Sequence, residues 1–182
     1  MRTVLTAQEP FRDVPGNWWT KAAQLKLDAL VAAGRDSEAE PLITQLSQLS
    51  TDPDSLSTAK VQQAASWARK GQHDKAIAAY DEVIKNSKTG DTLASAWLNK
   101  GHSLLALRKW EPAILAYLQV PVFHPANKLL VPQAMLGGAR AMTGLQDLTS
   151  AKTELEAIIT DFPTSPEATT AKTELEKLNK KQ

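Results

Sequence analysis

One arrangement of apolar residues recurs along the chain at a nearly constant step. An alanine is followed by large apolar side chains at successive spacings of three or four, as Tyr80 follows Ala76 and Val83 follows Tyr80. The alanines that begin the four copies are Ala39, Ala76, Ala113 and Ala151, at steps of 37, 37 and 38 residues. Spacings of three and four place side chains on one face of an α-helix, and a fixed period of this length indicates a repeat array.

Other positions keep the same register relative to the alanines. Five residues earlier the chain carries Gly34 and Gly71, where the later copies carry Arg108 and Gln146. Two more slots lie twelve and nine residues before each alanine: Leu27, Ala64, Gly101 and Ala139 fill the first, and Leu30, Trp67, Leu104 and Met142 fill the second. Because several slots agree over four copies, we interpret the chain as four structural repeats.

Each copy predicts two helices joined by a short turn. In the second copy an apolar stripe ends at the helix breaker Gly71, and Asp74 opens the next helix. So short a connection forces the two helices to lie antiparallel. No run of residues alternates with a period of two, so the predicted fold class is all-α.

Small residues and prolines agree with this pairing. Closely packed helices leave little room at their crossing, so we expect Gly101 and Ala139 on first helices to meet Ala113 and Ala151 on second ones. We expect Pro112 and Pro132 in first helical turns, and Pro53, Pro125 and Pro163 in the links between copies.

These patterns predict an α-solenoid of about four antiparallel helix hairpins. The expected hairpins span residues 17–53, 54–90, 91–128 and 129–163. Residues 164–182 are expected to form a capping helix, in which Leu175 and Leu178 supply a narrow apolar stripe and the rest faces water. Residues 1–16 are interpreted as the remnant of a preceding repeat or as a linker.

The third copy carries the residues of a known repeat. Its pattern is Trp97, Gly101, Leu104, Trp110, Ala113, Tyr117 and Pro125, which resembles a tetratricopeptide repeat. The resemblance covers residues 18–163. It departs from the family in its step, which is longer than the usual 34 residues or so, and in Arg108, which replaces the turn glycine. The resemblance implies a protein-binding scaffold, and the junctions between copies resemble those of bacterial cell-envelope members.

Composition and charge remove several classes of function. Lys and Arg total 21 against 20 Asp and Glu, a net charge of +1, without the basic excess of a nucleic-acid-binding protein. The chain has no cysteine and no apolar run long enough to span a bilayer. His73, His102 and His124 are too scattered to predict a metal site. We therefore expect no catalytic residue, no metal and no cofactor.

Aromatic residues are assigned mainly to packing. Trp67, Trp97 and Trp110 fall in repeat slots that face the core. Trp18 and Trp19 are adjacent and cannot both face inward on one helix. One of them is either exposed or covered by the N-terminal segment.

In proteins that this chain resembles, the first helices of the pairs line a concave face that holds a peptide or protein partner. The corresponding positions here are Lys21, Gln24, Asp28, Val61, Ala65, Arg69, Leu98, His102, Leu105, Leu136, Arg140 and Thr143. The set mixes apolar side chains with a few charged ones, which suits an amphipathic helix or an extended peptide.

Three alternatives stay open at this point. The concave face could be merely solvated, with another surface binding the partner. The chain could be a self-assembling structural protein, a homo-oligomer that stacks through Val4, Leu5 and Phe11 at its N-terminal end. It could also be the accessory repeat region of a larger enzyme or envelope complex.

Overall fold

The structure, a computed structural model, describes residues 18–49, 53–87 and 89–180. Within these ranges the chain forms nine α-helices and no strand. In order they are α1 (Trp18–Ala32), α2 (Asp36–Leu49), α3 (Pro53–Arg69), α4 (His73–Asn86), α5 (Gly90–Ala106), α6 (Trp110–Phe123), α7 (Leu130–Gly144), α8 (Leu148–Asp161) and α9 (Pro166–Asn179). The prediction of an all-α helical solenoid is confirmed.

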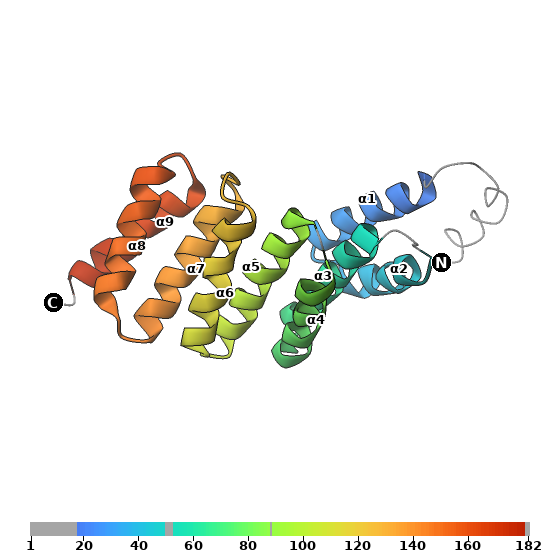
Figure 1. Ribbon diagram of the computed structural model, residues 1–182, viewed down its shortest axis with the longest axis horizontal. Helices are drawn as coiled ribbons and strands as arrows, with labels where there is room; N and C mark the ends of the chain where they lie inside the picture. The colour runs from blue at the N-terminus through green and yellow to red at the C-terminus, as the bar shows by residue number, and fades with distance from the viewer. Residues whose placement is uncertain (1–17, 50–52, 88, 181–182) are drawn as a thin grey trace.

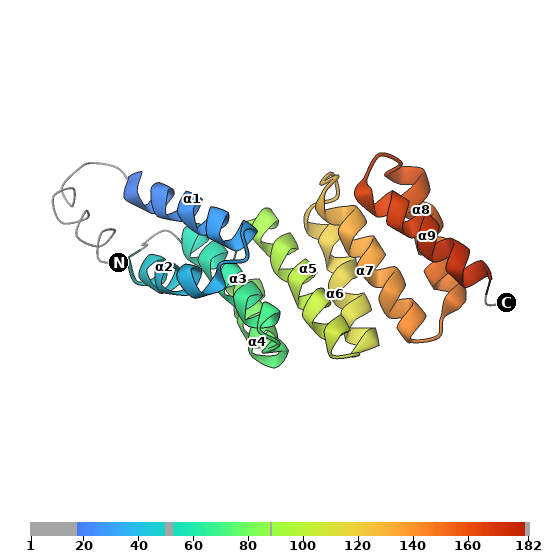
Figure 2. The same cartoon turned by 180° about the vertical axis from the view of Figure 1, so that it is seen from behind.

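Eight of these helices form four hairpins that follow one another along the long axis of the molecule. The hairpins are α1–α2, α3–α4, α5–α6 and α7–α8, and α9 packs against α7 and α8. The helices α1 and α9 therefore lie at opposite ends of the array (Figures 1 and 2). Residues 1–17 and the side chains of Trp18 and Trp19 lie outside the described part, as does the predicted stacking contact through Val4, Leu5 and Phe11.

The turn inside every hairpin has the same left-handed backbone. The residue five positions before each repeat alanine has a positive φ: 66° at Gly34, 77° at Gly71, 56° at Arg108 and 68° at Gln146. The next amide in each turn donates to the carbonyl of the slot nine residues before the alanine, as the Lys109 amide does to Leu104 at 2.9 Å. The left-handed residue donates through its own amide as well, as Arg108 does to the Leu105 carbonyl at 3.0 Å. These two hydrogen bonds are those of the Schellman motif, which ends a helix and reverses the chain.

The repeat alanines mark the centre of each hairpin. Ala39, Ala76, Ala113 and Ala151 are each 0% exposed. The large apolar side chains that follow them build four successive buried clusters along the array, one after another. Each cluster joins neighbouring helices only, so the core is a continuous row rather than a single centre, as in other stacked repeats.

The predicted pairing of small residues agrees with the structure for Ala139 and Ala151, which share one buried cluster, but not for Gly101. A Cβ on Gly101 would lie 2.6 Å from Cε1 of Tyr117, so the aromatic ring, and not Ala113, is the nearest neighbour. Gly137 on α7 contacts the same ring from the other side. The prediction paired small residues of first helices with the repeat alanines of second helices only. It did not consider the tyrosine ring, which reaches across the space between two neighbouring first helices.

The tryptophans in repeat slots do pack inward. Trp67 and Trp97 are half-buried against the clusters of their own repeats. Trp110 covers Gly144, where a Cβ would lie 2.7 Å from the indole ring. Lysines lie over two of the exposed ring faces, Lys75 over Trp67 at 4.0 Å and Lys100 over Trp97 at 4.9 Å from the centroid.

Helix ends follow the expected chemistry with one difference. Pro112 and Pro132 lie in the first turns of α6 and α7, as predicted. Pro53 does not lie in a link but is the first residue of α3, a position where the missing amide loses no helical hydrogen bond. The terminal helix α9 is capped by Ser165, whose side chain accepts from the Ala168 amide at 3.1 Å, and it buries Leu178 against the array.

Candidate protein-binding groove

The two kinds of helix form two layers of different curvature. First helices of neighbouring hairpins contact one another: α1 with α3, α3 with α5, α5 with α7 and α7 with α9. Among the described residues no second helix contacts another second helix. The first helices are therefore on the inner side of the curve and the second helices are spread along its outer side.

An open groove runs along this inner layer between α3 and α5. Its larger part has a volume of about 410 Å³ and is lined by Val31, Thr58, Val61, Gln62, Ala65, Arg69, Asp91, Thr92, Ser95 and Asn99. A second hollow of about 240 Å³ continues from it, lined by Ala65, Ala68, Arg69, His73, Tyr80, Asn99, His102 and Ser103. The two share Ala65, Arg69 and Asn99, and together we name them the α3–α5 groove.

Helical spacing aligns the walls of the groove. On α3 the lining positions Thr58, Gln62 and Ala65 lie three and four residues apart, on one stripe of the helix. The α5 wall repeats this stripe 37 residues later with Ser95, Asn99 and His102. The groove is thus built from equivalent slots of two adjacent repeats. Small side chains at Thr58, Ala65 and Ser95 leave part of the space between the two helices open.

The groove carries amide groups and charges of both signs. Asn99 donates through its amide nitrogen to the Ser95 carbonyl at 2.8 Å, which fixes its orientation on the wall. Asp91 at one end of the groove pairs with His124 at 2.7 Å. Arg69 lines both hollows at the centre. Such a surface offers hydrogen bonds to a polar chain without a dominant charge.

His102 lies where the groove meets α6. Its ring packs edge-to-face on Tyr117, with centroids 5.6 Å apart. The side chain is accessible, but the surrounding walls desolvate it, and this lowers its pKa below the usual value. The positive charge of Arg140 lowers the pKa further. His102 therefore presents a neutral imidazole to the groove at neutral pH, able to donate one hydrogen bond and accept another.

Two buried tyrosines lie beneath the inner layer. Tyr80 forms part of the groove lining, and Tyr117 occupies the same slot one repeat later. Burial raises the pKa of each phenol well above its usual value, so both stay protonated. They contribute bulk and a fixed floor to the site rather than charge.

The residues predicted for the concave face fall into three groups. Val61, Arg69 and His102 line the α3–α5 groove, together with Ala65. Leu98 and Leu136 are only 4% and 7% exposed and belong to the core clusters, and Leu105 packs partly against one of them. The remaining residues lie outside the groove lining: Lys21, Gln24, Asp28, Arg140 and Thr143. Of these, Gln24, Asp28 and Arg140 form contacts between adjacent first helices.

Those inter-helix contacts are polar. The Gln24 amide donates to Asp28 at 2.9 Å and to Gln62 at 3.1 Å, which joins α1 to α3. Arg140 on α7 donates through Nη2 to Glu174 on α9 at 2.7 Å. The four predicted residues Gln24, Asp28, Arg140 and Thr143 therefore lie on the inner layer, outside the lining of the groove.

Sequence reasoning missed the polar wall on α5. Thr92, Ser95 and Asn99 were not selected, because the stripe chosen on α5 ran through Leu98 and Leu105, which pack into or against the core. The available signal was the run of small polar residues at three- and four-residue spacing in the third repeat, matching Thr58 and Gln62 in the second. Which stripe faces the groove depends on how neighbouring first helices tilt against one another.

Two other features of the described residues bear on the kind of site. They contain no group of three or more His, Asp or Glu side chains arranged to hold a metal ion. None of their helices is long and apolar enough to cross a membrane. The arrangement is that of a helical repeat protein with an open groove on its inner layer.

Comparison with known proteins agrees with this architecture. The sequence profile of the family described as tetratricopeptide repeat matches residues 58–89 and 133–165, which cover most of the hairpins α3–α4 and α7–α8. No curated protein matches the chain in sequence. The second and fourth copies thus match the tetratricopeptide repeat, the family that the third copy resembles. Repeats of this family generally serve as protein-interaction scaffolds.

Several solved structures share the fold at low sequence identity. A MamA RS-1 ArsTM double mutant has a TM-score of 0.68 and 18% identity, over 89% of this chain and 84% of that one. A tetratricopeptide repeat protein from Parabacteroides merdae has a TM-score of 0.66 and 16% identity, over 89% of this chain and 60% of that one. Residues 41 to the end of MamA from Desulfovibrio magneticus RS-1 have a TM-score of 0.63 and 18% identity, over 90% and 96% of the two chains.

Proposed function

We propose that this chain is a non-catalytic scaffold that binds an extended peptide segment of a partner protein in the α3–α5 groove. The observation that carries the proposal is the groove itself, an open channel on the inner layer between two equivalent helical stripes. That the protein is located in the bacterial cell envelope stays a prediction, which rests on the resemblance of the junctions between copies.

The chemistry of the lining favours an extended segment over a helix. An extended chain exposes its backbone amides and carbonyls, and these need hydrogen-bonding partners. Gln62 and Asn99 carry amide side chains in equivalent slots of the lining, and the Gln62 amide also bonds to Gln24 and Asp28 on α1. A docked helix has no free backbone groups along its length and calls for a continuous apolar groove, whereas these walls alternate Thr, Ser and Asn with Ala and Val.

A pair of matched substitutions tests the site. Ala65 lines both hollows, so Ala65→Tyr should fill the centre of the groove, whereas Ala78→Tyr adds the same side chain at an exposed position on α4. Peptides selected from a random displayed library would be measured against both variants by fluorescence polarisation. We expect Ala65→Tyr to weaken binding at least about tenfold, since a filled pocket excludes the peptide, and Ala78→Tyr to leave it unchanged.

The conformation of the bound peptide is tested with the same reagents. A proline placed at successive positions of a selected peptide should be tolerated at most of them if the peptide is extended, but would disrupt a helix at nearly all interior positions. Peptides that bind the Ala65→Tyr variant as tightly as the wild type would contradict the site. Both variants should retain the helical circular dichroism of the wild type, because a misfolded variant would lose binding for another reason.

A further inference from the structure

The helix α6 is apolar on its outer side as well as on its inner side. Ala113, Ala116, Tyr117 and Val120 are buried against the neighbouring helices. On the opposite stripe Leu115 is 63% exposed, Leu118 49% and Val122 67%. We name these three residues the α6 ridge. It lies on a second helix and therefore on the outer layer of the array, away from the α3–α5 groove.

The fold does not require an apolar ridge at this place. The equivalent slots on α4 hold Ala78, Asp81 and Lys85, and those on α8 hold Thr153, Glu156 and Thr160. All six are exposed. The second helices α4 and α8 thus present polar or small side chains to water where α6 presents three large apolar ones. Exposed apolar surface of this kind marks an interaction site.

The ridge has the geometry of a helix-pairing seam. Its residues are spaced three and four apart, the spacing at which one helix packs along another. Phe123, the last residue of α6, and Leu129, in the link to α7, are also exposed. From their exposed fractions the five side chains offer roughly 500 Å² of apolar surface, at the upper end of the largest patches found on monomers.

We propose that the α6 ridge binds the α6 ridge of a second copy of this chain, with the two helices antiparallel. A two-fold axis near Leu118 places Leu115 of each copy against Val122 of the other, so the seam is complementary to itself. Burying this surface on both copies gives roughly 1,000 Å² in all, to which polar residues at the rim add. That size is typical of a weak, concentration-dependent dimer.

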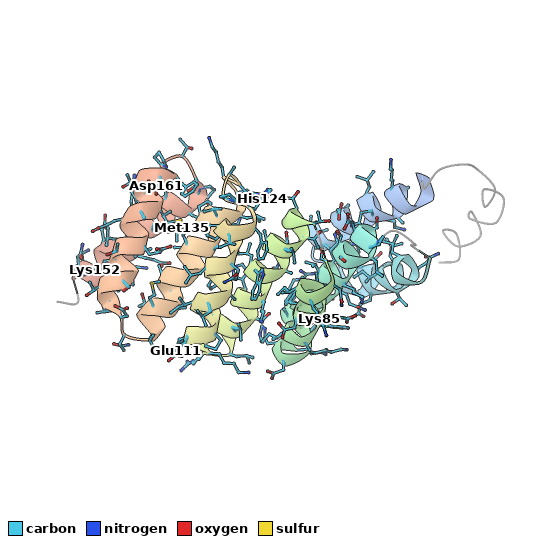
Figure 3. All side chains as sticks on the ribbon, in the orientation of Figure 1. Lys85, Glu111, His124, Met135, Lys152 and Asp161 are labelled. Carbon is cyan, nitrogen blue, oxygen red and sulfur yellow. The ribbon has the colours of Figure 1, made fainter. Side chains whose placement is uncertain are left out.

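Charges at the two ends of the ridge favour the antiparallel arrangement. Glu111 lies four residues before Leu115 on the same stripe, at the N-terminal end, and Lys128 follows the C-terminal end in the link to α7. Both are exposed. Figure 3 shows Glu111 at one end of α6 and His124, the residue that follows the helix, at the other end. Antiparallel pairing brings Glu111 of each copy toward Lys128 of the other, whereas parallel pairing sets like charges together.

Such a dimer has a consequence for binding. Because the seam lies on the outer layer, both α3–α5 grooves stay open and point away from the interface. Two grooves on one particle bind a partner that carries two copies of the same segment more tightly than one groove does, without any new contact.

The absence of cysteine from the sequence allows a direct test. Gln119 flanks the ridge near the proposed axis, and Ala157 is its half-buried equivalent on α8. In the otherwise complete chain, Gln119→Cys should form a covalent dimer with a short bismaleimide reagent, and Ala157→Cys should not. Adding Leu118→Glu to the Gln119→Cys chain should abolish the cross-link.

Sedimentation equilibrium supplies the second readout. The wild type should shift from monomer to dimer as its concentration rises, and Leu118→Glu should weaken that association at least tenfold. Glu111→Lys should also weaken it, and adding Lys128→Glu to the Glu111→Lys chain should partly restore the association. A wild type that is monomeric at its highest soluble concentration, or equal cross-linking of the Gln119→Cys and Ala157→Cys chains, would overturn the proposal. The Leu118→Glu variant should keep the peptide affinity of a single α3–α5 groove. Loss of dimerisation and loss of peptide binding can therefore be told apart.

Discussion

Gly137 on α7 lies against the ring of Tyr117 on α6 so closely that a Cβ on the glycine would be 2.4 Å from Cζ of the tyrosine. Gly101 on α5 approaches the same ring from the other side. The tyrosine is therefore held between the first helices of two neighbouring repeats. This contact joins three consecutive helices and sets how closely the third and fourth hairpins stack.

The adjacent glycines Gly137 and Gly138 provide a matched test of this contact. Alanine is favoured over glycine in a helix by about 1 kcal/mol, and at Gly138 the nearest atom to an added Cβ is 4.0 Å away. We expect Gly138→Ala to raise the free energy of unfolding by up to about 1 kcal/mol. Gly137→Ala should lower it by about 1–3 kcal/mol through overpacking, as measured by urea denaturation.

A double substitution identifies the cause. In a Tyr117→Leu background the ring is gone, so the cost of Gly137→Ala should shrink or change sign, while the effect of Gly138→Ala should stay the same. An equal cost of Gly137→Ala in both backgrounds would show that the tyrosine ring is not the source of the strain.

The left-handed turns predict two stabilising substitutions. Arg108 and Gln146 hold positive φ values of 56° and 68° in slots where the earlier repeats have glycine. A non-glycine residue in this region carries a steric cost that glycine avoids. We expect Arg108→Gly and Gln146→Gly each to raise the free energy of unfolding by about 0.5–1 kcal/mol, and Gly71→Ala to lower it by about 1 kcal/mol. Thermal melts of the three variants would reveal a wrong sign at once.

The repeat alanines predict a strong dependence on side-chain size. Ala76 is 0% exposed at the crossing of α3 and α4, so Ala76→Leu should overpack the hairpin and cost about 1–3 kcal/mol. Ala78 is exposed two residues later on the same helix, and Ala78→Leu should change stability by no more than about 0.5 kcal/mol. Similar melting temperatures for the two variants would refute the assignment of the repeat register.

His102 predicts a loss of stability under mildly acidic conditions. Desolvation, and then the charge of Arg140, lower its pKa in the folded chain below the ordinary 6.5. The unfolded chain therefore takes up a proton at higher pH than the folded chain does. The resulting contribution to stability is present above pH 6.5 and is lost as the pH falls below it. His102→Gln should flatten the stability profile in that range.

Charge substitutions around His102 should move its pKa in opposite directions. Arg140→Gln removes a positive charge, so the pKa should rise toward the ordinary value, although desolvation keeps it below. Glu174→Gln removes the carboxylate that pairs with Arg140 and should lower the pKa further. An NMR titration of the His102 ring protons measures both shifts, and shifts of the same sign would contradict this account.

The sequence by itself determined the helices, their pairing, the turn slots and the buried alanines. These features depend on residues three, four or a few positions apart, and such short-range spacing is written directly in the chain. The positive φ at Arg108 and Gln146 follows from the register alone, because they occupy the slots of Gly34 and Gly71. The resemblance to tetratricopeptide repeats rested on the same register.

Only the tertiary structure decided which side chains of the first helices line the open groove. Leu98 and Leu136 have the spacing of an inner-face stripe, yet they are buried, because neighbouring first helices contact one another and close over these positions. The space that stays open lies between α3 and α5 and is walled by Ser95 and Asn99. Its position depends on the tilt between adjacent repeats. Side chains such as Tyr80, which packs with α3 and α5 in one buried cluster, set that tilt, and no local pattern encodes it.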